Sequence, residues 1–248
     1  SRPIKPKARG VHINGAWPQR PGYPNEEKDE IVNDRAHQAR FGSSVFLMKA
    51  WVKVPGSSGN LASGFDVAAA ALHVHFELEI EVVNSIRGDP IDLKNMVIAL
   101  SYPILRRAFP KSGFRWKMIN GIPMGKGLGS SAAARLGALA AARLLALSEE
   151  PSLAVVRETA HLEGHRDNAA ASWKGGLALT WETPQGVEVS SWKMPADLKA
   201  IVCIPELTLS TGKARRVLPR QVSREDAVFN LSRQGALLSA IRKRQYHW

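Results

Sequence analysis

Strand-forming segments stand out first in the pattern of apolar and polar residues along the chain. Residues 48–54 alternate, and residues 73–82 alternate more plainly still, as His-Val-His-Phe-Glu-Leu-Glu-Ile-Glu-Val. Such alternation predicts strands with one buried face. We expect further strands at 115–122, 177–181 and 199–204, and a buried segment at 67–72.

Helical spacing alternates with these strands. Residues 132–147 are almost pure Ala and Leu, which predicts a strong and mostly buried helix. The other segments with helical spacing are 95–108, 151–162 and 224–245. Because strands and helices are interspersed and no repeat is visible, the predicted fold class is α+β.

Residues 1–47 differ from the rest of the chain. Five prolines lie among charged residues, and no apolar period extends over the length of a helix or a strand. We therefore predict a disordered or non-native extension, either an upstream translation product or tag or else a functional arm. The folded part is expected to begin near Met48.

Composition narrows the class of protein. With 248 residues, 44% apolar and 23% charged, the chain is long enough for a substantial core. The single cysteine, Cys203, excludes an internal disulfide and a cysteine-based zinc cluster. The sequence shows no signal peptide and no apolar run of about 18 residues, so we expect a cytoplasmic protein with no membrane partner.

The net charge of +12 is concentrated near the C-terminus, where residues 212–248 carry nine Lys and Arg against two Asp and Glu. A basic tail of this kind is found in nucleic-acid-binding proteins. It lacks the interleaved aromatic residues of a single-strand binder, however, and a polyanionic small molecule such as a nucleotide explains the charge equally well. We expect no nucleic-acid partner.

The glycine-rich segment 121–135 reads Gly-Ile-Pro-Met-Gly-Lys-Gly-Leu-Gly-Ser-Ser-Ala-Ala-Ala-Arg. Glycines 125, 127 and 129 let backbone N–H groups converge, Lys126 adds a positive charge, and a helix begins at the end of the segment. These are the parts of a phosphate-binding loop. The spacing fits neither the Walker A loop nor the dinucleotide fingerprint, and a glycine-rich helix start that binds nothing is the alternative.

Residues 123–132 resemble the P-x-x-x-G-L-G-S-S-A motif of the GHMP kinases, named after galactokinase, homoserine kinase, mevalonate kinase and phosphomevalonate kinase. The resemblance implies that this loop binds ATP and that the Ser131 hydroxyl reaches Mg²⁺. It also implies that Asn95 lies near the adenine. The implied ATP-binding residues are Asn95, Pro123, Met124, Gly125, Lys126, Gly127, Leu128, Gly129, Ser130, Ser131, Ala132 and Ala133.

Three further segments resemble the homoserine kinases in particular. They are V-P-G-S-S-G-N-L-A-S-G-F-D at 54–66, E-G-H-R-D-N-A-A at 163–170 with the later glycine pair 175–176, and the two strings at 209–219 and 227–233. The resemblance implies a substrate pocket formed by Asn60, Asp66, His165, Asn168 and Arg215. A carboxylate suits an ammonium group, and the guanidinium fork of Arg215 suits a carboxylate.

The implied activity is the ATP-dependent phosphorylation of the L-homoserine hydroxyl in threonine biosynthesis, with Asp66, Lys126 and Asn168 as catalytic residues. No general base is identified, and Asp66 and Asp167 are the candidates. Two alternatives stay open. One is another GHMP kinase, of the mevalonate or diphosphocytidyl-methylerythritol type, and the other is a catalytically impaired nucleotide-binding homologue. A homodimer also stays open.

The resemblance also implies a two-domain organisation. Residues 48–197 would form an N-terminal ATP-binding domain of the S5-domain-2-like type, and residues 198–248 an incomplete ferredoxin-like C-terminal domain that lacks a third glycine-rich motif. In the homoserine kinases the Mg²⁺-binding Glu lies eight residues before the motif His, where this chain has Arg157. We therefore expect the neighbouring Glu158 to share Mg²⁺ with Ser131.

Overall fold

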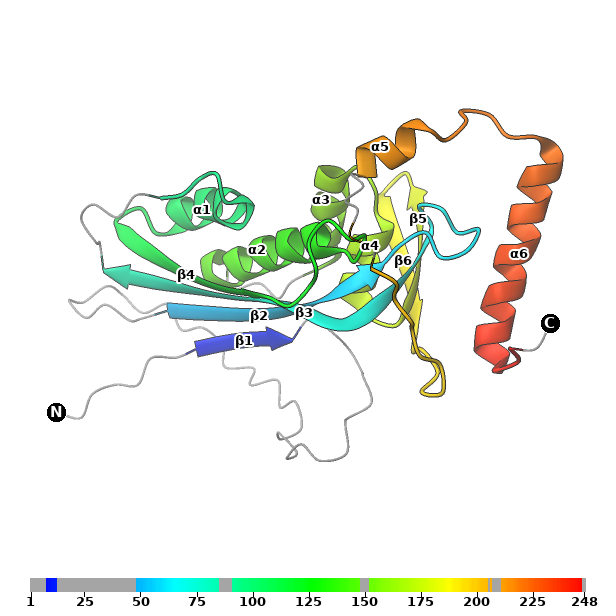
Figure 1. The fold of residues 1–248 in the computed structure, drawn as a ribbon. Coiled ribbons are helices and arrows are strands. Elements are labelled where there is room, and N and C mark those ends of the chain that lie inside the picture. The colour runs from blue at the N-terminus through cyan, green and yellow to red at the C-terminus, as the bar shows by residue number, and fades with distance from the viewer. Residues whose placement is uncertain are drawn as a thin grey trace.

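The computed structural model describes residues 8–12, 48–84, 91–147, 152–204, 206 and 211–246. Its centre is a sheet covered on one face by helices (Figure 1). The strand order is β1 (Ala8–His12), β2 (Met48–Ser58), β3 (Ala68–Asn84), β5 (Leu177–Thr183) and β6 (Gly186–Trp192). Strand β4 (Ser112–Asn120) also pairs with β3. This mixture confirms the expected α+β class.

The long strand β3 (Ala68–Asn84) organises the sheet. It pairs antiparallel with β2 (Met48–Ser58) on one side, across a register shift between Pro55 and Gly56. On its other side its first residues pair with β5 (Leu177–Thr183), and its second half pairs with β4 (Ser112–Asn120). The hairpin strand β6 (Gly186–Trp192) completes this end of the sheet.

The alternation at 73–82 is confirmed within β3. Phe76, Leu78, Ile80 and Val82 are all buried in the core. The glutamates between them lie on the opposite face, where Lys53, Lys49 and Arg115 pair with Glu77, Glu79 and Glu81. Such partly exposed pairs contribute little to stability, so apolar burial fixes the orientation of this strand.

Helix α2 (Ser130–Leu147) is the central helix of the covering layer (Figure 1). Its small residues allow a close approach to the sheet, since a Cβ at Gly137 would lie 3.0 Å from the Phe76 ring. Helix α1 (Met96–Ala108) packs along α2. By length and composition α2 could cross a membrane, but 67% of it is buried inside the protein, as in the core helix of a globular fold.

Helices α3 (Leu153–Glu163) and α4 (Asp167–Lys174) bring the 163–170 motif to the end of the sheet. Gly164 ends α3 in the left-handed conformation, with φ 75°, and lets the chain reverse into α4. Helix α4 contacts β2, β3 and β5, so its first residues lie beside the 54–66 motif.

Two elements differ from the sequence-based expectation. Ala8–His12 form strand β1, parallel to β2, inside the segment where we expected no regular structure. Edge strands are held by backbone hydrogen bonds, so such a strand needs no apolar period. The rest of the predicted extension, 1–7 and 13–47, lies outside the described residues. The strand expected at 199–204 is wrong, because these residues form no strand.

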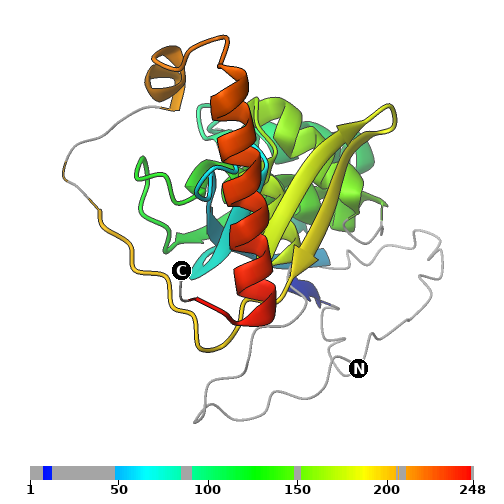
Figure 2. The same ribbon diagram turned by 90° about the vertical axis from the view of Figure 1, so that its right-hand side faces the viewer.

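The C-terminal region contains the short helix α5 (Thr211–Arg216) and the helix α6 (Arg224–Lys243). Helix α6 stands apart from the helices over the sheet in Figure 1, and in Figure 2 it runs across the end of the sheet that faces the viewer; Ala240 is its one buried residue. Its exposed apolar side chains include Val228, Phe229 and Leu231. Helices are the only regular elements among residues 211–246, where the described chain contains no strand, so a ferredoxin-like domain stays a prediction.

Candidate active site

The glycine-rich loop connects β4 to the start of α2. Gly125, Gly127 and Gly129 all have left-handed backbones, with φ of 68°, 72° and 71°. A Cβ at Gly127 would meet nothing within 4 Å, so this part of the loop borders open space. Left-handed residues at alternate positions turn successive N–H groups toward one side, and the α2 N-terminus adds partial positive charge there. The loop can therefore bind an anion such as phosphate.

The loop is packed directly on the end of β2. A Cβ at Gly129 would lie 2.4 Å from Ser57 Oγ, and Ser57 N donates a hydrogen bond of 3.0 Å to Leu128 O. A Cβ at Gly56 would lie 2.8 Å from the same carbonyl oxygen. Only residues without a side chain permit this approach, so the glycine-rich loop and the 54–66 motif form one site.

The remaining residues predicted to bind ATP differ in their hydrogen-bond partners and in their burial. Lys126 Nζ donates to Glu206 O at 3.1 Å. Asn95 caps α1, accepting from Val97 N at 3.0 Å and Ile98 N at 3.4 Å, so its side-chain oxygen already has backbone partners. Leu128, Ala132 and Ala133 are buried and anchor the loop, whereas Met124 is exposed. Pro123 is half-buried, and Ser130 accepts a hydrogen bond from Asn120.

The structure brings Asp66 and Arg215 into a bidentate ion pair. Arg215 Nη1 donates to Asp66 Oδ2 at 2.7 Å, Nη2 donates to Asp66 Oδ1, and the Phe65 ring lies 5.0 Å from the Arg215 guanidinium carbon. Asp66 N donates to Asn60 Oδ1 at 2.9 Å. Three residues of the predicted substrate pocket therefore meet, although Arg215 belongs to α5 and the others to the 54–66 motif.

Asp167 joins this group from α4. Its side chain is 1% exposed; Oδ2 accepts from Asn60 N at 3.1 Å, and Oδ1 lies 3.1 Å from His165 Nδ1. Burial raises the pKa of the Asp167 carboxyl, but hydrogen bonds from His165, Asn168 N and Asn60 N outweigh it and hold the pKa below its usual value. The hydrogen bond to Asp167 raises the pKa of His165 against the opposing effect of burial.

Asn168 ties α4 to the end of β2. Its Nδ2 donates to Ser57 O at 3.1 Å and to Ser57 Oγ at 3.0 Å, and Ser57 Oγ donates back to Asn168 O at 3.1 Å. Ser172 Oγ lies 2.9 Å from the same Ser57 hydroxyl. The Asn168 amide therefore also holds Ser57, the residue against which Gly129 packs.

The structure does not bring Glu158 to Ser131. Glu158 forms an ion pair with Arg143, whereas Ser131 Oγ donates to Glu163 Oε1 at 2.6 Å and Arg135 pairs with the same carboxylate. Five residues turn a helix by about 140°, so the two glutamates of α3 point in different directions. Sequence reasoning missed Glu163 as the acidic residue next to Ser131, although Glu163 begins the 163–170 motif.

Among the residues that the structure describes, no group of three or more His, Cys, Asp or Glu side chains could hold a metal ion. Ser131 and Glu163 place two side-chain oxygen atoms next to each other beside the glycine-rich loop. Hard cations such as Mg²⁺ are commonly held by one or two protein oxygens together with substrate phosphates. This pair fits such a shared site.

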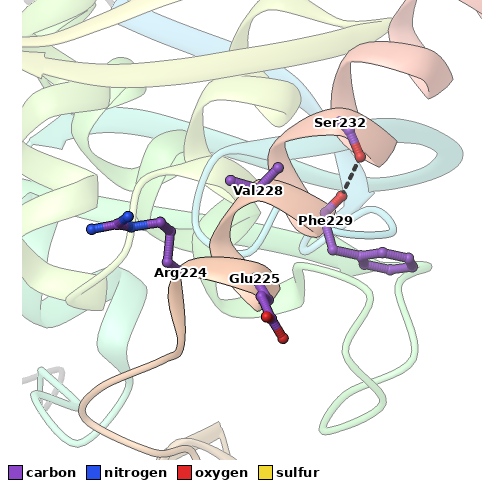
Figure 3. A pocket seen from close by; sticks show the side chains of 5 residues that line it. All are labelled: Arg224, Glu225, Val228, Phe229 and Ser232. Carbon is purple, nitrogen blue, oxygen red and sulfur yellow. Dashed lines mark hydrogen bonds between the residues drawn. The ribbon is translucent and has the colours of Figure 1, made fainter.

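A separate hollow of about 440 Å³ lies along the first turns of α6 (Figure 3). Arg224, Glu225, Val228, Phe229 and Ser232 line it, and Ser232 Oγ donates to Phe229 O at 2.8 Å. None of these residues belongs to the predicted site. Helix α5 contacts the 54–66 motif through Arg215. Helix α6 contacts the same motif through Gln234, whose Oε1 accepts a hydrogen bond from Ser63 Oγ at 3.4 Å.

The fold and the loop define a kinase of the GHMP class. Residues 95–176 match the family model described as the GHMP kinases N terminal domain. The structure of phosphomevalonate kinase from Streptococcus pneumoniae superposes with a TM-score of 0.56 at 14% identity, covering 79% of this chain and 74% of that one. At this identity the match shows the fold alone.

Closer relatives specify the branch. The homoserine kinase of Persephonella marina is 35% identical over 204 residues, which cover 79% of this chain and 68% of the relative. That of Corynebacterium urealyticum is 36% identical over 212 residues, covering 79% and 69%. The homoserine kinase structure from Cytophaga hutchinsonii superposes with a TM-score of 0.61 at 23% identity, covering 82% and 70%. The chain belongs to the homoserine kinases of the GHMP kinase family.

Proposed function

We propose that the protein phosphorylates the hydroxyl of L-homoserine with ATP, giving O-phospho-L-homoserine in threonine biosynthesis. The observation that carries this proposal is the Asp66–Arg215 pair, which Asn60 and Asp167 connect to the residues next to the glycine-rich loop. An amino acid carries an ammonium and a carboxylate on one carbon, so a neighbouring carboxylate and guanidinium complement it. Mevalonate and galactose lack the ammonium group, so this pair suits them less well.

The residues of the loop fit ATP and Mg²⁺. Open space beside Gly127, the N–H groups of 125–131 and the α2 N-terminus suit the triphosphate, and Lys126 adds a full charge. Ser131 and Glu163 would hold Mg²⁺. When bound, ATP supplies the phosphoryl group and Mg²⁺ neutralises part of its charge.

Phosphoryl transfer depends mainly on positioning and charge stabilisation, and the chain's own residues supply both. The Asp66–Arg215 pair would open to admit the amino acid, so that Arg215 binds the substrate carboxylate while Asp66 and Asn60 bind its ammonium group. His165, on the side of the pocket facing Glu163, would orient the hydroxyl toward the loop. The buried Leu128 and Ala133 keep the loop in place against the core.

Binding of L-homoserine provides the first test. In saturating Mg-ATP, L-homoserine at about 100 times its dissociation constant should stabilise the chain by about 2.7 kcal/mol, which a thermal melt detects. Mevalonate and galactose should leave the melting temperature unchanged. A shift with mevalonate and none with L-homoserine would contradict the proposal and favour another GHMP kinase.

A further inference from the structure

We propose that Asp167 is a positioning residue that holds the 54–66 motif in its place relative to the glycine-rich loop, and that it does not act as a general base. The assignment rests on the proposed function and extends it to a residue outside the predicted substrate and ATP sets. Three observations carry it: the contacts of its two carboxylate oxygens with different residues, the close approach of Gly59, and its place in a chain of contacts.

Both oxygens of the Asp167 carboxylate are engaged, and in different directions. Oδ2 accepts the backbone N–H of Asn60, and Oδ1 contacts His165 Nδ1, each at 3.1 Å. With 1% of its surface exposed, the carboxylate is shielded by the protein. A general base needs an oxygen within hydrogen-bond reach of the substrate proton, and a carboxylate with 1% of its surface exposed leaves no open approach for the substrate hydroxyl.

Gly59 permits this arrangement. A Cβ there would lie 2.2 Å from Asp167 Oδ2 and 2.9 Å from Asn168 Oδ1. The backbone of Gly59 in the 54–66 motif therefore lies directly against the side chains of Asp167 and Asn168 at the α4 N-terminus. Asp167 holds Asn60 and Asn168 holds Ser57, so two consecutive residues fix both ends of segment 57–60.

Asp167 is also the central member of a continuous chain of contacts across the site. On the nucleotide side Ser131 contacts Glu163 at 2.6 Å, and Glu163 Oε2 lies 3.5 Å from His165 Nε2. On the substrate side Asn60 Oδ1 accepts from Asp66 N at 2.9 Å, and Asp66 pairs with Arg215. Removal of the Asp167 carboxylate breaks this chain of contacts between His165 and Asn60.

Two variants test the proposal in different ways. Asp167→Asn removes the charge and places an N–H₂ group where one oxygen accepts, while Gly59→Ala keeps the carboxylate and displaces it. Each should weaken L-homoserine binding at least about tenfold, because small misplacements in such sites have large effects. The affinity for a non-hydrolysable ATP analogue with Mg²⁺ should change less than about twofold. Isothermal titration calorimetry measures both affinities.

Matched controls separate this effect from general damage. Gly235→Ala adds a methyl group where nothing lies within 4 Å, and Glu188→Gln removes from β6 a carboxylate that pairs with Arg157 of α3. Both should bind L-homoserine like the wild-type chain. If Asp167→Asn does not fold, Gly59→Ala decides the question, because its carboxylate remains.

Three results would overturn the assignment. One is a large fall in kcat for Asp167→Asn with L-homoserine affinity unchanged, the result expected of a base. Another is L-homoserine affinity within twofold of wild type in both variants. The third is equal losses for both ligands, the result of general damage. A wild-type chain that binds the ATP analogue but not L-homoserine would contradict the proposed function instead, before any variant is compared.

Discussion

Asp66 and Arg215 lie 149 positions apart in the chain and form the most specific contact of the site. Sequence motifs predicted both residues as substrate ligands. Their pairing with each other could not be predicted, because it depends on where α5 lies relative to the 54–66 motif. The sequence therefore named residues that meet in the structure but not how they are arranged, and their role in binding substrate stays a prediction.

Replacement of Arg215 by Lys should weaken L-homoserine binding by about 1.5–3 kcal/mol, the usual worth of a hydrogen bond to a charged group. Lysine keeps the charge but loses the planar fork that binds a carboxylate through two donors. Calorimetric titration of L-homoserine measures the change. Arg220→Lys, at an exposed position, serves as the control, and equal affinity in the two variants would contradict the role of the fork.

The lowered pKa of Asp167 predicts a pH dependence of stability. A group whose pKa is lower in the folded than in the unfolded chain stabilises the fold above its unfolded pKa of about 3.9, and this contribution is lost as the pH falls through the folded pKa. The difference in free energy of unfolding between wild type and Asp167→Asn should therefore shrink below about pH 4. Urea titrations from pH 5 to pH 3, where His165 stays protonated, measure it, and a difference that grows as the pH falls through this range would be inconsistent with the assigned shift.

Among the helices and strands, prediction from sequence succeeded where the repeating pattern of apolar residues was long. The strand at 73–82 and the helix at 132–147 have strong patterns, and both are present. Helix α4 has eight residues and β1 five, too few for a period to show. Rotation within α3 also escaped prediction, since Glu158 and Glu163 are both plausible in sequence and only the packed helix shows which one meets Ser131.

The two glutamates of α3 predict different metal behaviour. Glu163→Gln should raise the Mg²⁺ concentration needed for half-maximal turnover at least about tenfold, because one of two oxygen ligands loses its charge. Glu158→Gln should leave that concentration unchanged, since it loses only its pair with Arg143. Turnover measured across a Mg²⁺ titration compares them, and the reverse order would restore Glu158 as the ligand.

Two glycines of the loop form a second matched pair. Gly127→Ala and Gly129→Ala place a methyl group on left-handed residues of nearly equal φ, so their backbone strain is similar. At Gly129 the methyl group also collides with Ser57, which should cost about 1–3 kcal/mol more. Thermal melts with and without Mg-ATP should show the larger loss for Gly129→Ala, and equal losses would contradict the packing of the loop on β2.

For the whole molecule, composition and charge predicted less than the motifs did. The +12 charge is compatible with several anionic partners, and the site itself favours a nucleotide. The placement of α5 and α6 could not be predicted, because their exposed surfaces provide no buried face with a period. Yet α5 supplies Arg215, so a site predicted mainly within 48–197 is completed from outside that range.

Formation of the phosphorylated product tests the central claim most directly. The chain is incubated with Mg-ATP and L-homoserine, and the reaction is followed by ³¹P NMR. We predict the growth of one phosphate-monoester resonance together with ADP, absent when mevalonate or galactose replaces L-homoserine and absent in Arg215→Ala. A monoester formed from mevalonate, or ADP and free phosphate with no monoester in any mixture, would contradict the assignment as a homoserine-phosphorylating enzyme.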